Sequence, residues 1–146
     1  MAAPALDALP ATHPWAGRLD GIEQLACADL FRAAPPGVAR RCGAVVAEVD
    51  GALLMRTEAL PGERMFNRAM GLGAPGADLA RQLAEVRSFF RGAPHIVSLD
   101  GAAPASAARD AARAGYVPDY PWDKFARGAE EPPAAATDLA VREAGP

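Results

Sequence analysis

The sequence has few of the residues that build covalent or metal-bound scaffolds. It holds two cysteines, Cys27 and Cys42, and two histidines, and their spacing matches no ligand motif, so we expect neither a disulfide framework nor a metal site. No stretch approaches the roughly 18 apolar residues that a membrane helix needs. The N-terminus has no basic residue ahead of an apolar block, unlike a secretory signal. These absences predict a reduced, cytoplasmic protein.

Concentrated positive charge is also scarce. A single lysine, Lys124, stands beside 14 arginines, the net charge is −3, and the basic residues are scattered along the chain. Such a chain lacks the basic stripe that neutralises a phosphate backbone, so we expect no nucleic-acid partner. The length of 146 residues fits one ordinary domain.

The first half of the chain predicts one long helix followed by an antiparallel meander. A helical pattern begins at Asp20 and stops at the prolines after residue 34. Asp50-Gly51 lies between two apolar runs, 44–49 and 52–57, which is a strong hairpin signal. A third strand is predicted over 65–70. The stripe of the helix that we expect to face the core consists of Ile22, Leu25, Ala26 and Leu30.

The second half predicts alternating helices and strands. A glycine turn at 71–73 precedes a helix over 78–91 that Asp78 caps, and a strand is predicted over 95–99. An alanine-rich helix over 104–115 follows. Short closing strands are predicted at 116–117 and 122–126.

This element order resembles that of the GNAT superfamily of acyl-CoA-dependent N-acetyltransferases. The run Arg68-Ala69-Met70-Gly71-Leu72-Gly73 is similar to the family's R/Q-x-x-G-x-G/A pyrophosphate loop. Ala112-Arg113-Ala114-Gly115-Tyr116 resembles the exit of the family's last helix. Together with the aromatic stretch at 122–127, the likeness is to the degenerate N-terminal unit of bacterial two-unit members.

The resemblance implies a domain plan and a fold. It implies a poorly ordered segment over 1–18, a GNAT-like domain over 19–127, a linker over 128–137, and over 138–146 the start of a second unit. The implied fold is α/β (α+β), with a mixed, largely antiparallel sheet flanked by helices. Its fourth and fifth strands, here 65–70 and 95–99, would splay apart to admit the pantetheine arm.

The resemblance also implies a chemistry, acetyl transfer from acetyl-CoA to an amine. Arg68, Gly71, Leu72 and Gly73 would then bind the cofactor's pyrophosphate through backbone N–H groups at a helix start. A second GNAT unit, in cis or in trans, and a small-molecule amine acceptor are the partners it implies. No catalytic residue is assigned.

Two departures from the family pattern favour a different outcome. Four residues, 74–77, are inserted between the glycine loop and the helix, and Pro75 removes one N–H donor. Ala111 occupies the position of the family's usual acid, a tyrosine. The alternative function is therefore a non-catalytic GNAT-fold domain that braces a partner and binds no cofactor.

Single residues also leave two interpretations open. Glycines 71 and 73 suit a strand-to-helix turn without a ligand, which the insertion favours. Other polar or reactive residues suit either chemistry or an ordinary structural place in the fold. These are Cys27, Cys42, Glu48, Glu58, Asn67, His95, Tyr116 and Tyr120.

Overall fold

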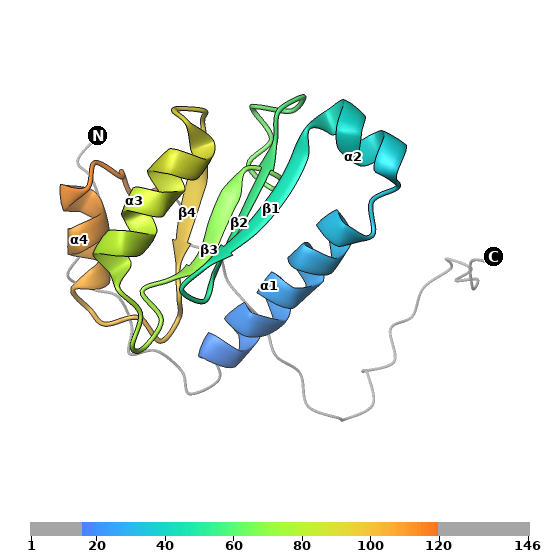
Figure 1. Ribbon diagram of the computed structural model, residues 1–146. Helices are drawn as coiled ribbons and strands as arrows, with labels where there is room; N and C mark the ends of the chain where they lie inside the picture. Colours follow the sequence, from blue (N-terminus) through green and yellow to red (C-terminus); the bar gives the residue numbers. More distant parts are fainter. Residues whose placement is uncertain (1–15, 120–146) are drawn as a thin grey trace, which may run out of the picture.

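A four-stranded sheet with four helices forms the described part of the protein. The computed structural model describes residues 16–119 (Figure 1). The elements in chain order are α1 (Ala16–Arg32), α2 (Pro36–Cys42), β1 (Ala44–Val49), β2 (Ala52–Thr57), β3 (Arg68–Leu72), α3 (Leu79–Phe90), β4 (Ile96–Leu99) and α4 (Ala107–Arg113). The predicted closing strand at 122–126, the linker and the start of a second unit lie outside the described residues.

The sheet follows chain order, β1-β2-β3-β4, and it is mixed. β1, β2 and β3 pair antiparallel, whereas β3 and β4 run parallel. The predicted hairpin is confirmed: Asp50 and Gly51 adopt φ of 49° and 78°, the positive values that a two-residue turn of this type requires. The expected mixed α+β class and the antiparallel meander are therefore correct.

Helices cover both faces of the sheet (Figure 1). α3 and α4 lie on one side, and α1 lies across the other. Side chains alternate along a strand, so Leu54 of β2 joins the core beneath α3 while Leu53 and Met55 join the core beneath α1. As a result β2 and β3 are the buried centre of the molecule.

The predicted inner stripe of α1 is wrong. Ile22, Leu25 and Leu30 point to solvent, with 64%, 65% and 60% of their surface exposed. The face that packs on the sheet carries Asp20, Gln24, Cys27, Ala28 and Phe31. Polar residues on this inner face bind the sheet and its loops, so hydrophobicity alone points to the wrong side of the helix. α1 also begins at Ala16, before Asp20 and within the segment expected to be poorly ordered.

β3 begins later than predicted. Asn67, which is 2% exposed, accepts a hydrogen bond from Thr57 N–H and donates to the carbonyls of Leu60 and Glu63. These bonds hold residues 65–67 in a turn, and the strand starts at Arg68.

The expected splay between β3 and β4 is absent over their paired length. Arg68 pairs with Ile96 at one end and Leu72 with Leu99 at the other, with a bulge between Met70 and Leu72. Asp100 N–H then donates to Leu72 O at 2.8 Å, beyond the last strand residue. The ladder stays closed because the bulge is absorbed inside the strand, at Gly71, instead of separating the strands.

The remaining predictions differ from the structure mainly at their ends. Cys42 is the last residue of α2, and β1 begins at Ala44, as predicted. α3 begins after its predicted cap Asp78, whose side chain accepts from Arg81 N–H, and it ends at Phe90 with Arg91 in the left-handed region. Residues 116–117, predicted as a closing strand, form no strand.

Candidate functional site

The loop between β3 and α3 is the site that the sequence singles out. Gly71 and Gly73 both have positive φ, 75° and 73°, so the tight turn expected there is present. Three amides of the segment are already engaged in internal hydrogen bonds. Gly73 N–H donates to Gln82 Oε1 at 2.8 Å, Ala77 N–H to Ala74 O at 2.9 Å, and Asp78 N–H to Asp50 Oδ2 at 3.0 Å.

Gln82 organises this loop from within the core. Its side chain is 1% exposed and lies on the inner face of α3 beside Leu83 and Val86. While Oε1 accepts from Gly73, Nε2 donates to the carbonyl of Asp50 at 2.8 Å. One buried amide therefore joins the β1–β2 hairpin, the glycine loop and α3.

The charge at the start of α3 is negative. The carboxylates of Asp50 and Asp78 both accept amide protons there. A helix N-terminus favours an anion, and in this protein two aspartates of the chain itself occupy that position.

Arg68 does not reach the glycine loop. Its side chain is 2% exposed and lies with Met70 on the α1 side of the sheet, whereas α3 covers the other side. The guanidinium donates to Glu23 Oε1 at 2.7 Å and to Cys27 Sγ at 3.1 Å. Arg68 therefore connects β3 to α1, away from Gly73.

Gly71 and Leu72 also have structural roles, in packing and in hydrogen bonding. A side chain at position 71 would overlap the amide of Gln24, because a Cβ built there lies 2.8 Å from Gln24 Cδ. Leu72 is 0% exposed, and its carbonyl accepts from Asp100. Of the four predicted cofactor residues, 71–73 are contiguous at the end of β3, and Arg68 is directed elsewhere.

A cavity of about 350 Å³ adjoins the loop at the carboxyl ends of β3 and β4. None of its lining residues carries a charge. They are Gly73, Ala74, Pro75, Gly76, Ala77, Leu79, Ala102 and Pro104. The space suits a small apolar group better than a diphosphate.

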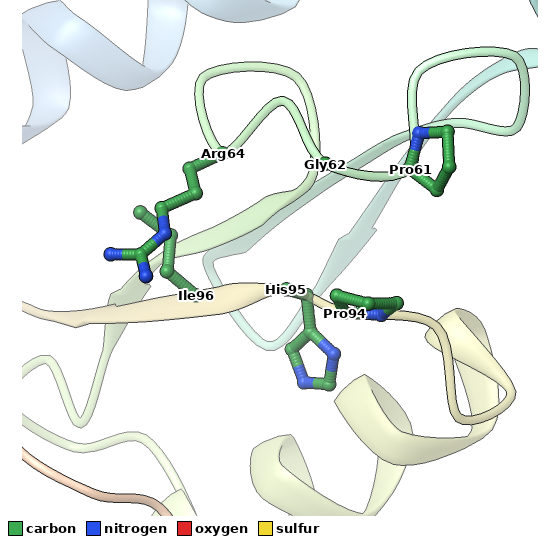
Figure 2. A pocket seen from close by; sticks show the side chains of 6 residues that line it. All are labelled: Pro61, Gly62, Arg64, Pro94, His95 and Ile96. Atoms are coloured by element: carbon green, nitrogen blue, oxygen red, sulfur yellow. The ribbon is translucent and has the colours of Figure 1, made fainter.

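A second cavity of about 340 Å³ lies at the opposite end of the strand pair. Figure 2 shows its lining: Pro61, Gly62 and Arg64 come from the β2–β3 loop, and Pro94, His95 and Ile96 from the start of β4. The imidazole of His95 points away from the β2–β3 loop, toward α3. It stacks on Phe90 at a centroid distance of 4.1 Å.

His95 and Tyr116 form a hydrogen-bonded pair. His95 Nδ1 lies 2.8 Å from the carbonyl of Ala93, which only accepts, so we assign the proton to Nδ1. Nε2 is then the acceptor for the Tyr116 hydroxyl at 3.2 Å. Burial raises the pKa of Tyr116, and the charge of Arg87 acts in the opposite direction.

The two ends of the β3–β4 pair do not combine into one reaction centre. His95 precedes the Arg68–Ile96 pair, while Gly73 follows the Leu72–Leu99 pair. At about 3.3 Å per strand residue, this separation is on the order of 15 Å. The His95–Tyr116 pair therefore lies far from the glycine loop.

The other candidate residues hold structural contacts. Glu48 and Glu58 are exposed and form ion pairs with Arg32 and Arg56. Cys27 and Cys42 are free, half-buried thiols.

Within residues 16–119 there is no group of three metal-ligating side chains, and no helix is long and apolar enough to cross a membrane. Tyr120 lies outside the described residues.

The sequence contains a signal for one residue of the site that its patterns do not single out. Gln82 is a polar residue next to Leu83 on the apolar face of a predicted helix, and such a residue needs buried partners. For Asp50 the sequence predicts only a place in the hairpin turn, and nothing near it indicates its contacts with Asp78 and Gln82. Nothing in the local sequence indicates that Glu23 pairs with Arg68, which lies in a different element.

Comparison with known proteins adds no relative. No family model, no curated protein and no solved structure matches this chain. The resemblance to acetyltransferases therefore depends on the quoted residues and the element order alone.

Proposed function

We propose that this chain is a non-catalytic domain of acetyltransferase-like element order, which braces a partner protein and does not use acetyl-CoA. The observation that carries this proposal is the hydrogen bond from Gly73 N–H to the buried amide of Gln82. The amide that the resemblance assigns to the cofactor's pyrophosphate already has an internal partner.

Binding a diphosphate at this loop would be costly. The diphosphate would take the N–H of Gly73, so the buried Oε1 of Gln82 would accept no hydrogen bond. An unsatisfied buried polar group costs about 1–3 kcal/mol. The diphosphate would also place negative charge beside the carboxylates of Asp50 and Asp78. No basic side chain lines the adjoining cavity to offset this repulsion.

The pairing of β3 with β4 also opposes binding of the cofactor's pantetheine arm. A pantetheine arm between β3 and β4 would need to displace ladder hydrogen bonds, including the one from Asp100 to Leu72. Both the diphosphate and the arm therefore meet groups that already bond to each other.

The outer side of α1 supports a bracing role. Ile22, Leu25 and Leu30 expose most of their surface on one face of one helix. Apolar side chains grouped in this way are typical of protein–protein contacts. The partner would be a second folded unit, in cis or in trans.

The alternative is an active GNAT-type N-acetyltransferase, with acetyl-CoA as cosubstrate and a small-molecule amine as acceptor. Two observations favour it. The bulge between Met70 and Leu72 lies in the strand that leads to the glycine loop. The cavity of about 350 Å³ lies at the carboxyl ends of two parallel strands, where α/β sheets often bind ligands.

Calorimetric titration of the full chain with acetyl-CoA distinguishes the two functions. We expect no heat, and no thermal shift, at about 1 mM cofactor. Adenosine 3′,5′-bisphosphate tests anion binding without the thioester arm, and Ala74→Asp adds a carboxylate at the edge of the cavity. Binding of acetyl-CoA below about 100 μM that Ala74→Asp weakens would overturn the bracing proposal.

A further inference from the structure

The cavity between the β2–β3 loop and the start of β4 has the chemistry of a site for an aromatic ring. Figure 2 shows Pro61 and Pro94 on opposite sides of it, with Arg64 extending from the loop toward Ile96. Proline rings and an arginine stem offer apolar surface, and a guanidinium binds the face of tryptophan best among the aromatic rings. Its volume of about 340 Å³ has room for one large side chain.

Exposed apolar side chains adjoin this cavity along the chain. Leu60 and Met65 flank the loop residues that line it, and they are 40% and 48% exposed. Val117, in the segment that follows α4, is 84% exposed. Apolar surface grouped in this way is typical of a surface that another segment or molecule covers.

The described chain ends beside the same cavity, where two contacts hold it. The hydroxyl of Tyr116 donates to Nε2 of His95, and the carboxylate of Asp119 accepts from the guanidinium of Arg64. His95 and Arg64 both belong to the cavity lining. Residue 120 therefore begins next to the cavity.

The residues that follow Asp119 are rich in aromatic side chains, since Tyr120, Trp122 and Phe125 lie within six positions. Pro121 restricts the residue before it to an extended conformation of the polyproline type. In that conformation the side-chain direction repeats every third residue, at about 3.1 Å per residue. Trp122 then points the same way as Asp119, which is toward Arg64, about 9 Å farther along the chain.

We propose that Trp122 inserts into this cavity, so that segment 120–122 docks in cis against the β2–β3 loop and the start of β4. The occupant is this segment because the ion pair between Asp119 and Arg64 brings it to the cavity. Its indole also matches a lining of prolines and one arginine. The inference goes beyond the proposed function and is independent of whether the chain binds acetyl-CoA.

The two isoleucines of the chain provide a direct test of contact, since Ile96 lines the cavity and Ile22 lies on α1. In the full chain labelled at isoleucine methyl groups, Trp122→Leu should shift the Ile96 resonance by several linewidths, because the indole no longer lies against it. The Ile22 resonance should stay in place, because its side chain is 64% exposed on another element. An Ile96 resonance that Trp122→Leu leaves unchanged overturns the proposal.

Tryptophan fluorescence tests the cavity itself. In a Trp15→Phe background Trp122 is the remaining tryptophan, and acrylamide should quench it at least about 3-fold more slowly than in the urea-unfolded chain. Gly62→Phe should abolish this protection by placing a ring in the cavity, and nothing lies within 4 Å of a Cβ added there. Gly21→Phe is the matched control, because its Cβ meets equally open space on α1.

Three results of the quenching experiment overturn the proposal. Trp122 quenched as fast in the folded chain as in urea is not docked. Protection that Gly62→Phe leaves intact, while circular dichroism shows the fold retained, means that the indole is buried elsewhere. Protection that appears only as the concentration rises from about 5 to 500 μM means that the ring enters from a second copy.

Discussion

Gln82 shows how a single buried polar residue decides what a loop is available to do. Its amide accepts from Gly73 and donates to Asp50, so both of its polar atoms are satisfied inside the core. Because the bonds cross three elements, they fix the glycine loop more firmly than the turn residues alone. The same contacts that shape the loop remove the donor that a phosphate would need.

Replacing Gln82 with leucine should destabilise the protein by about 2–4 kcal/mol. The variant leaves the buried Gly73 N–H without its partner, at about 1–3 kcal/mol, and removes the partly buried bond to the carbonyl of Asp50, at about 0.5–1.5 kcal/mol. Urea unfolding followed by circular dichroism measures the loss. Glu85→Leu, on the exposed side of α3, should change the free energy of unfolding by less than about 0.5 kcal/mol. Equal effects from the two variants would contradict the role of Gln82.

Tyr116 should make stability fall at alkaline pH. Burial raises its pKa above the ordinary value of about 10, so the unfolded chain releases this proton first. Below about pH 10 both states hold the proton, so the contribution of Tyr116 to stability is fully present and does not change with pH. As pH rises through 10 the unfolded state gains, and this contribution to stability is lost. Urea unfolding between about pH 8 and 11 should show a shallower decline for Tyr116→Phe.

Two further readouts make the Tyr116 prediction specific. Absorbance at about 295 nm follows tyrosinate directly, and the difference between wild type and Tyr116→Phe isolates this residue. At neutral pH the free energy of unfolding of the variant should be about 0.5–1.5 kcal/mol lower, because phenylalanine lacks the hydroxyl that donates to His95. Parallel pH profiles for the two proteins would rule out the raised pKa.

At the scale of elements, the accuracy of the sequence predictions depends on how local the cause is. The hairpin at Asp50-Gly51 and the cap at Asp78 arise from backbone conformations that a few neighbouring residues determine. The sequence predicts α1 as a helix but with the wrong side facing the sheet, because the packed side is set by Asp20 meeting the loop after β4 and by Gln24 meeting Gly71 in β3. The absence of a splay likewise depends on the β3–β4 pairing, which is separated in the chain by α3.

Gly71→Ala should cost more than Gly76→Ala because only Gly71 lies under a helix. Both glycines have positive φ, 75° and 87°, so each alanine meets a backbone cost of about 1 kcal/mol or more. A Cβ at position 71 also overlaps the Gln24 side chain, whereas nothing lies within 4 Å of one at position 76. The atoms that this Cβ meets are the end of the flexible Gln24 side chain, which can rotate away, so we expect Gly71→Ala to cost about 0.5–1 kcal/mol more than Gly76→Ala in urea unfolding. Equal losses would show that α1 yields without cost.

At the scale of the whole molecule, the described sheet has a buried centre and two half-buried outer strands. Every residue of β3 is buried, while β1 has only half-buried and exposed residues and β4 is half-buried throughout. Composition and periodicity predicted the class and the strand order along the chain. They did not predict the burial of Arg68, because a cation in a central strand is tolerated only with its partner Glu23 on α1.

Amide hydrogen exchange should separate β3 from the outer side of β4. Ile96 N–H donates to Asn67 O and Asp100 N–H to Leu72 O, so these amides point toward β3. Directions alternate along a strand, which turns the amides of Val97 and Leu99 to the outer edge, where no strand of residues 16–119 pairs with them. Val97 and Leu99 should exchange at least about 10-fold faster than Asp100, their matched control in the same chain segment. Protection of Val97 and Leu99 equal to that of Ala69 in β3 would contradict an open edge, and would mean that a segment outside 16–119 pairs with β4.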